Sequence, residues 1–180
     1  MTRRSNLYGD FNERKFSLEG GGAFYGTFHP ADEGSFSSAK FVYERRLLRT
    51  RPRAKISAGD IFFADKERYL VANHESGYRK LFKSFRAFRI TDRLEWTQDT
   101  EGAIDPVTKR PKRGAQNSRG SIWATKERIQ DEELDISTRV KQERYRIVCA
   151  EPVAIGDTIG NLNVTRSDRE LGVYLLEAEA

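Results

Sequence analysis

The chain has few of the side chains that build catalytic and metal sites. Of its 180 residues, one is cysteine and two are histidine. With Cys149 alone the chain cannot form an internal disulfide, and a structural zinc site would lack a second cysteine ligand. Cys149 ends the apolar run 147–149, a setting in which free cysteines are usually buried. We therefore expect an inert, buried thiol.

The sequence patterns of common active sites are also missing. Neither His29 nor His74 lies in a His-Glu-x-x-His pattern, and the chain has no Gly-x-x-x-x-Gly-Lys-Ser/Thr loop and no Gly-x-Ser-x-Gly turn. The three glycines at 20–22 lack the flanking strand and helix that dinucleotide binding needs, and they favour a hinge. We predict no catalytic residue, no cofactor and no metal ion, and hence no enzyme. A small hydrolase is the alternative if one histidine faces a carboxylate in a cleft.

Long apolar runs are absent as well. No run approaches the roughly 18 residues that a membrane-spanning helix needs. Residues 1–7 carry two arginines but no apolar segment follows them, so a secretion leader is not expected. The single cysteine fits a reducing compartment. We expect a chain with no membrane partner, located in the cytoplasm or in a particle assembled there.

Charge is abundant but mixed in sign. Charged residues make up 33% of the chain and hydrophobic residues 37%, which predicts a modest core and a highly charged surface. Thirty-two Lys and Arg against 27 Asp and Glu give a net charge of +5. This balance allows nucleic-acid binding without requiring it. The length suits one domain or two small ones.

Several segments carry the pattern of short β-strands. Residues 67–69 and 143–145 both read Glu-Arg-Tyr, and each lies near a Gly-Asp turn, at 59–60 and at 156–157. The segments 61–63 and 67–73 flank the polar pair 65–66, which predicts a β-hairpin. Further strands are predicted at 121–125, 136–150, 158–159, 163–165 and 171–176. Together these segments predict a mainly β fold, a small β-barrel or sandwich.

Two other segments have no clean period. Residues 36–50 fit one long strand or a short helix, and we favour the strand. Residues 78–90 match an amphipathic helix, because their aromatic and aliphatic residues nearly follow helical spacing. The hairpin-sized loop before them favours sequential strands instead. We predict a strand at 78–90, with the helix as the alternative.

The predicted organisation is an extended N-terminal arm, residues 1–34, followed by a β-rich body, residues 35–180. The arm carries isolated aromatic residues among glycines. Such arms usually become ordered on a partner, and we predict partner contacts for Phe11, Phe16, Phe24 and Tyr25. The alternatives are a floppy terminus or a strand folded back on its own body.

Residues 99–120 predict a long basic loop within the body, because they contain glycines, prolines and cations but almost no apolar residues. Loops of this length are often functional, so Lys109, Arg110, Lys112 and Arg113 are predicted partner contacts. A solvated insertion is the alternative.

The same cations raise a second hypothesis, a soluble nucleic-acid-binding module. In the run 79–89, Arg and Lys lie beside aromatic residues, a combination that can hold phosphates while bases stack. We favour the alternative that these aromatics are core residues whose flanking cations face solvent.

Six short turn-and-strand motifs carry a resemblance to a known family. They are Ala58-Gly59-Asp60, Glu67-Arg68-Tyr69-Leu70-Val71, Asp105-Pro106-Val107-Thr108, Glu143-Arg144-Tyr145-Arg146-Ile147, Gly156-Asp157 and Leu171-Gly172-Val173-Tyr174. Together they resemble the neck proteins of tailed bacteriophages, of the head-tail connector type that closes the head or joins it to the tail. The likeness covers residues 55–180, and the turn at 109–111 is more basic than its counterpart in the family.

The resemblance implies a structural protein of the virion neck, assembled in the host cytoplasm. Its subunit would be a β-barrel or sandwich that forms a homo-oligomeric ring around the DNA channel. Its partners would be further copies of itself, the portal or an adaptor protein, and the tail proteins, with transient contact to packaged DNA. The four loop cations would then face either an acidic neighbouring ring or the DNA.

Overall fold

The structure is a computed structural model that describes residues 13–30, 45–73, 82–104, 111–129 and 143–180. The described residues contain twelve β-strands and no helix. The first six strands are β1 (Arg14–Leu18), β2 (Ala23–Pro30), β3 (Arg45–Thr50), β4 (Ile61–Ala64), β5 (Glu67–Asn73) and β6 (Lys83–Arg89). The other six are β7 (Asp92–Ile104), β8 (Pro111–Arg128), β9 (Arg144–Cys149), β10 (Thr158–Ile159), β11 (Leu162–Glu170) and β12 (Val173–Glu179). The prediction of a mainly β fold is confirmed.

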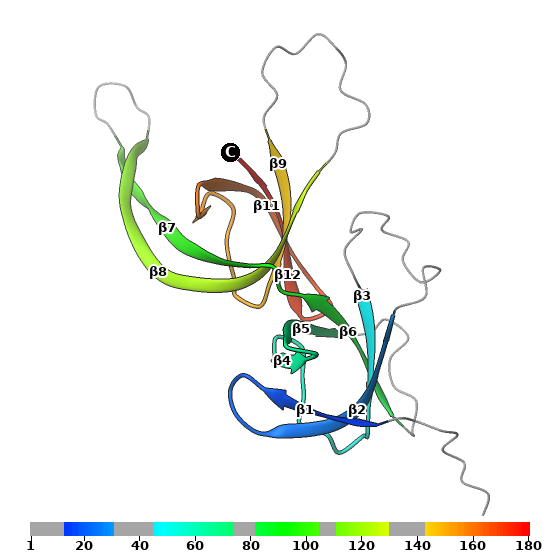
Figure 1. Ribbon diagram of the computed structural model, residues 1–180. Helices are drawn as coiled ribbons and strands as arrows, with labels where there is room; N and C mark the ends of the chain where they lie inside the picture. Colours follow the sequence, from blue (N-terminus) through cyan, green and yellow to red (C-terminus); the bar gives the residue numbers. More distant parts are fainter. Residues whose placement is uncertain (1–12, 31–44, 74–81, 105–110, 130–142) are drawn as a thin grey trace, which may run out of the picture.

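Each group of six strands closes into an antiparallel barrel, and both barrels have the same strand order (Figure 1). The first barrel has the order β1-β2-β3-β6-β5-β4, and β4 pairs with β1 to close it. The second has the order β7-β8-β9-β12-β11-β10, and β10 pairs with β7. Closure pairs both edges of a sheet and removes the open edge that invites aggregation. The chain is therefore a tandem repeat of one six-stranded topology.

The two Gly-Asp turns occupy the same place in the two barrels, just before β4 and β10. Gly59 and Gly156 have φ angles of 94° and 91°, a region that glycine adopts without steric cost. The Asp60 carboxylate accepts a hydrogen bond from the Ser57 backbone N–H at 2.8 Å. The Asp157 carboxylate accepts one from the backbone N–H of residue 154 at 2.9 Å. These turns are the clearest trace of the repeat in the sequence.

The repeated Glu-Arg-Tyr sequence, by contrast, lies on strands that are not equivalent. Residues 67–69 begin β5, whereas 143–145 lead into β9, and the counterpart of β9 in the first barrel is β3. Both copies do form the same local contact. The Tyr69 hydroxyl donates to Glu67 at 2.8 Å, and the Tyr145 hydroxyl donates to Glu143 at 2.7 Å. Residues i and i+2 share one face of a strand, so the echo reflects a local pairing and not the repeat.

The cores of the two barrels differ in chemistry. The first is filled by five aromatic residues with ring centroids 4.8 to 5.9 Å apart, mostly edge to face: Phe16, Phe24, Phe28, Phe62 and Tyr69. The second is mainly aliphatic, with Ile122, Ile147, Ile159, Leu162 and Leu176 among its buried residues. Cys149 lies in this second core, as predicted, and burial raises the pKa of its thiol to about 12.

The predicted N-terminal arm is wrong over its described part. Residues 14–18 and 23–30 are β1 and β2 of the first barrel, so the alternative of strands folded back on the body holds. Phe16 and Phe24 are 3% and 4% exposed, because they pair across β1 and β2 inside the barrel. Gly21 and Gly22, both with φ of 91°, form the tight turn between these strands and not a hinge. Residues 1–12, with Phe11, and 31–34 lie outside the described residues.

The predicted long loop at 99–120 is also wrong. Strand β7 continues to Ile104 and β8 begins at Pro111, so that only 105–110 lie outside the described residues. The two strands keep pairing over this stretch, with Glu101 opposite Arg113, through several register shifts. Register shifts and bulges let a twisted ribbon include residues that fit a flat sheet poorly.

The remaining strand predictions are largely confirmed. Lys83–Arg89 form strand β6 and not a helix, and the 61–73 hairpin is β4 and β5. The predicted strands near 121–125, 158–159, 163–165 and 171–176 lie in β8, β10, β11 and β12. Within 36–50 the described strand is β3, and within 136–150 it is β9; residues 36–44, 78–81 and 136–142 lie outside the described part.

Candidate functional site: the projecting hairpin and the seam between the barrels

The β7–β8 hairpin extends well beyond the second barrel (Figure 1). Strand β7 pairs with β10 only at Trp96 and Thr97, and β8 pairs with β9 only from Ala124 to Arg128. Beyond those positions the register places the two strands against each other alone, among the described residues. We call residues 98–104 of β7 and 111–121 of β8 the ribbon. The ribbon therefore has two outer edges that no described strand covers.

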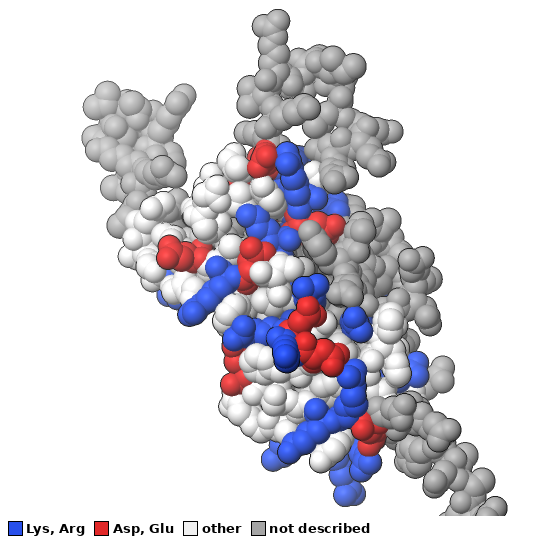
Figure 2. Space-filling view, viewed as in Figure 1, with Lys and Arg blue, Asp and Glu red and all other residues white. Residues whose placement is uncertain are grey.

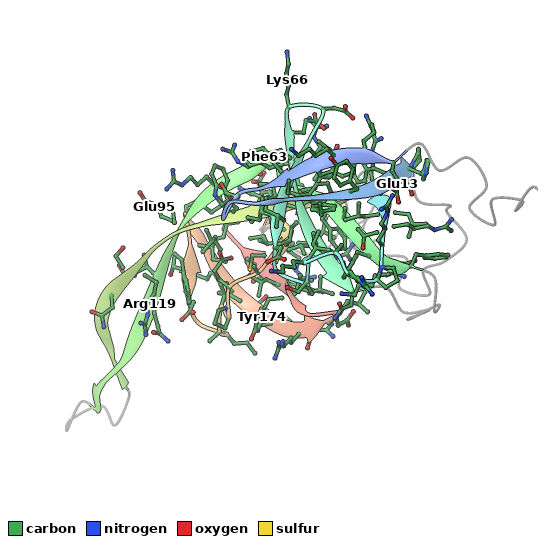
Figure 3. The ribbon with its side chains drawn as sticks, turned by 90° about the horizontal axis from the view of Figure 1, so that it is seen from below. Glu13, Phe63, Lys66, Glu95, Arg119 and Tyr174 are labelled. Atoms are coloured by element: carbon green, nitrogen blue, oxygen red, sulfur yellow. The ribbon has the colours of Figure 1, made fainter. Side chains whose placement is uncertain are left out.

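Exposure shows that the inner part of the ribbon lacks a core. Residues 116–121 of β8 are all exposed, whereas a strand with one face on a core alternates between buried and exposed residues. Arg119 reaches across to β7, where its guanidinium donates to the Gln98 side chain, through Nε at 2.8 Å and also through Nη2. Figure 3 shows Arg119 on the part of the hairpin that points away from the barrels. Polar cross-strand contacts, not burial, hold this part together.

The equivalent hairpin of the first barrel has no such extension. Strands β1 and β2 have five and eight residues, against 13 and 18 for β7 and β8. The β1–β2 turn closes at once, since the Leu18 backbone N–H donates to the Gly22 carbonyl at 3.2 Å. The ribbon is thus an addition to the common topology and not a part of the barrel that the repeat requires.

The two barrels are joined along a seam. A third apolar cluster draws members from both barrels: Leu70, Ala72, Phe88, Val148 and Val173. The connection between the barrels is only Ile90 and Thr91, and both backbone N–H groups are bonded, to the Arg68 and Ala124 carbonyls at 2.9 and 3.1 Å. Burial and short bonded connections oppose independent motion of the two barrels.

Close backbone packing completes the seam. The Asn73 backbone N–H at the end of β5 donates to the Leu171 carbonyl at 2.7 Å, and the Thr125 hydroxyl donates to the Arg89 carbonyl at 2.6 Å. Gly172 in the β11–β12 turn lies so close to the first barrel that a Cβ there would approach the Ala58 Cβ to 2.5 Å. The seam therefore depends on a glycine at this position.

The base of the hairpin is anchored across the seam by an aromatic residue and two arginines. The guanidinium of Arg68, on β5, lies 4.3 Å from the ring centroid of Trp123, on β8. Arg93, on β7, lies 5.2 Å from the same ring and also donates through Nε to the Ser121 hydroxyl at 2.9 Å. Cation–π contacts of this kind contribute about 0.5–1 kcal/mol each where solvent reaches them. The Arg68 contact holds the root of the ribbon against the first barrel, and the Arg93 contacts connect β7 to β8 there.

Charges of both signs are interspersed over the face of the molecule shown in Figure 2. Several of the cations form ion pairs: Arg14 with Asp65 at 3.1 Å, Arg51 with Glu13 at 2.6 Å, Arg89 with Glu67 at 2.8 Å and Arg144 with Glu179 at 3.0 Å. Exposed pairs contribute little to stability. Their effect here is to place a carboxylate beside each of these cations.

Among the ionisable groups with shifted pKa values, Cys149 and Glu151 interact: the Cys149 thiol donates to the Glu151 backbone carbonyl at 3.5 Å, and, after burial, the Glu151 charge adds to the rise in the pKa of the thiol. Burial raises the pKa of Glu151, whose Oε2 has no hydrogen-bond partner among the described residues. The hydrogen bond to Glu143 raises the pKa of the Tyr145 hydroxyl. In the described part of the chain, no three His, Cys, Asp or Glu residues lie close enough together to hold a metal ion. His29 is exposed there, and His74 lies outside the described residues.

Of the predicted partner contacts, the structure brings few to one surface. Tyr25 is 53% exposed on β2, whereas Phe16 and Phe24 are core residues. Lys112 and Arg113 lie on the β8 strand of the ribbon; Phe11, Lys109 and Arg110 lie outside the described residues. Sequence reasoning missed the contact of Trp123 with Arg68 and Arg93, because these residues are far apart in the chain and meet only when the barrels pack.

Within the described residues, no helix has the length and apolar character needed to cross a membrane. Comparisons with protein families, with curated proteins and with solved structures found no match.

Proposed function

We propose that this chain is a structural subunit of a bacteriophage neck, which forms a ring that joins the portal end of the head to the tail around the DNA channel. The resemblance of residues 55–180 to neck proteins suggests this role. The described fold is compatible with it, since two closed barrels packed along a seam make a stiff building block, and one hairpin reaches outward.

The observation that carries the proposal is the ribbon. A two-stranded hairpin in water is marginally stable by itself; in this one residues 116–121 are exposed, and no described strand pairs with either outer edge. Such a segment gains order and burial when another chain covers it. A subunit whose projecting segment is completed by neighbours suits assembly better than turnover of a substrate.

In this role the partners would be further copies of the chain, the portal or an adaptor protein on one side, and tail proteins on the other. Packaged DNA would pass through the ring and contact it transiently. The protein would assemble in the host cytoplasm and remain in the virion. Its work would be to join surfaces.

Electron microscopy and mass photometry of the purified protein test the proposal. We expect rings with cyclic symmetry, either from the protein alone or on addition of the portal protein encoded with it. A chain that stays monomeric in both cases and never enters particles contradicts the proposal.

A second candidate, a nucleic-acid-binding module, is favoured by the basic composition of β8, with Lys112, Arg113 and Arg119 before it enters the barrel. The run 79–89, which was predicted to stack on bases, argues against nucleic-acid binding, because Phe85 and Phe88 are buried, at 6% and 5% exposure. Fluorescence anisotropy with duplex and single-stranded DNA tests this candidate. Affinity should fall steeply with salt in proportion to the phosphates neutralised, and no binding at low salt rules it out.

A further inference from the structure

The two strands of the ribbon carry opposite charges. The β7 part, residues 98–104, has Asp99 and Glu101 and no cation, a net charge of −2. The β8 part, residues 111–121, has Lys112, Arg113 and Arg119 and no acid, a net charge of +3. Strands β9 and β12 of the second barrel are also separated by charge, with two arginines on β9 and two glutamates on β12, but they pair with each other inside the closed sheet, whereas each strand of the ribbon has an outer edge that no described strand covers.

The uncovered edges determine which contacts between copies are possible. The outer edge of the ribbon along β7 belongs to the strand with the acidic residues, and the outer edge along β8 belongs to the strand with the basic residues. Unpaired strand edges readily accept a strand of another chain. A contact between two β7 edges, or between two β8 edges, would place like charges side by side and is disfavoured. The contact between a β7 edge and a β8 edge places opposite charges side by side.

This choice of edges also determines the symmetry. A contact between two identical edges is isologous and stops at a dimer, whereas a contact between different edges is heterologous and forms a ring where the rotation between copies closes, or an open chain where it does not. When ribbons point the same way around a ring, β7 of one copy runs antiparallel to β8 of the next, because the two strands of each hairpin are antiparallel. Geometry and charge therefore favour the same arrangement.

We propose that the ribbons of successive copies pair edge to edge, β7 of one copy with β8 of the next, and form one antiparallel sheet of alternating acidic and basic strands at the ring interface. This inference rests on the proposed function, since it identifies the surface through which the ring would form. It assigns the ribbon to contacts between copies of this chain, and not to DNA or to the neighbouring tiers.

A charge-swapped chain tests the pairing. The variant Asp99→Lys, Glu101→Lys, Lys112→Glu, Arg113→Glu, Arg119→Glu exchanges the signs of the two strands, so opposite charges still face each other within one hairpin and between copies of the variant. We expect it to assemble with itself as the wild type does. In a mixture with wild type, every mixed interface places like charges together.

The readout is co-assembly of wild type and swapped chains that carry two different fluorophores and are mixed as monomers in equal amounts at low salt. We expect mixed rings to be about tenfold or more below the statistical proportion, with the discrimination reduced at high salt. The matched control is Lys15→Glu, Lys66→Glu, two exposed positions of the first barrel, which should co-assemble freely with wild type.

The outcomes separate this inference from the proposed function. Rings in which wild type and swapped chains mix freely overturn the ribbon pairing and leave the ring itself in place. Preferential mixing of the two overturns it in favour of contacts between identical edges. Charge-dependent pairing into dimers or open chains without rings retains the edge contact and contradicts the neck role. Wild type that is monomeric under all conditions, with and without portal protein, contradicts both.

Discussion

At the scale of single residues, the two Gly-Asp turns perform the same backbone task with different consequences. Asp157 is 3% exposed, and its Oδ2 accepts hydrogen bonds from the Trp96 indole N–H and the residue 154 backbone N–H, both at 2.9 Å. Asp60 is half-buried and accepts from the Ser57 backbone N–H and hydroxyl at 2.8 and 3.2 Å. The buried aspartate connects the turn to β7, close to the root of the ribbon.

We expect Asp157→Ala to lower the free energy of unfolding by about 2–4 kcal/mol, because it leaves two partly buried donors without an acceptor. The matched variant Asp60→Ala, whose donors can reach water, should cost about 0.5–1.5 kcal/mol. Urea unfolding followed by tryptophan fluorescence and circular dichroism measures both. Equal losses in the two variants would show that the Trp96 contact does not stabilise the second barrel.

The half-buried carboxyl of Glu151 gives the stability a pH dependence. Burial raises its pKa above the ordinary value of 4.5, so the folded chain retains a proton that the unfolded chain releases as pH rises past that value. The free energy of unfolding therefore falls with rising pH through that range. We expect Glu151→Gln to gain stability relative to wild type from about pH 4.5 upward and then level off. Unfolding in urea at several pH values measures the difference, and a difference that does not change with pH contradicts the assignment.

Residue types alone identified some of these features and missed others. The turn role of both Gly-Asp pairs and the burial of Cys149 could be predicted, since glycine geometry and free-thiol burial are local properties. The burial of Phe16 and Phe24 was missed, because aromatics scattered among glycines show no period. They become core residues only when β1 and β2 pair and close the barrel on β4.

At the scale of elements, hydrophobic alternation reports burial and not backbone conformation. Hairpins with one face on a core, such as β4–β5, were predicted correctly for that reason. The sequence predicts a loop for the ribbon, because its residues, apart from Ile104 and Pro111, are polar, small or charged and show no alternation of apolar and polar residues. What makes it a ribbon is the ladder between β7 and β8, which single-strand propensity does not record.

The turn between β11 and β12 is the element that most directly tests the seam. Gly172→Ala would require φ of 84° from a residue with a side chain and would place its Cβ 2.5 Å from that of Ala58. We expect a loss of roughly 2–4 kcal/mol. Gly156→Ala is the matched control, since it has φ of 91° but no atom within 4 Å of the new Cβ, and should cost about 1–2 kcal/mol.

Adding Ala58→Gly to the Gly172→Ala variant should recover the steric part of this loss and bring the cost down to that of the control. Chemical denaturation of all four proteins gives the comparison. If the double variant is no more stable than Gly172→Ala alone, the contact between the barrels is not what constrains this turn.

At the scale of the whole molecule, the tandem repeat could not be predicted, because the two barrels share strand order but not side chains. An aromatic core fills one and an aliphatic core fills the other, and many different sequences can fill a barrel of one topology. The Gly-Asp turns are the part of the repeat that is visible in the sequence, since few residues other than glycine adopt the positive φ angle that these turns require. The repeated Glu-Arg-Tyr sequence does not mark equivalent strands of the two barrels, because it reflects a Tyr–Glu side-chain contact that any strand can form.

Comparison of the two barrels shows that the ribbon is not needed to close a barrel. A barrel closes without it, as the short β1–β2 hairpin of the first barrel shows, so the stability of the fold does not account for the extra length of β7 and β8. The added residues extend outward, separate opposite charges onto two strands, and are anchored at the base by Trp123. A segment with these properties is suited to joining one copy of the chain to another.

The most direct measurement is the mass in solution of a chain that lacks the outer ribbon. In this variant residues 98–117 are replaced by Asn-Gly, which connects Thr97 to its register partner Ser118 through a two-residue turn. The pairing of β7 with β10 and the anchor at Trp123 are retained, so we expect a cooperatively folded monomer under conditions in which the full chain forms rings. Rings of unchanged copy number from the shortened chain would contradict the assignment of the ribbon to assembly.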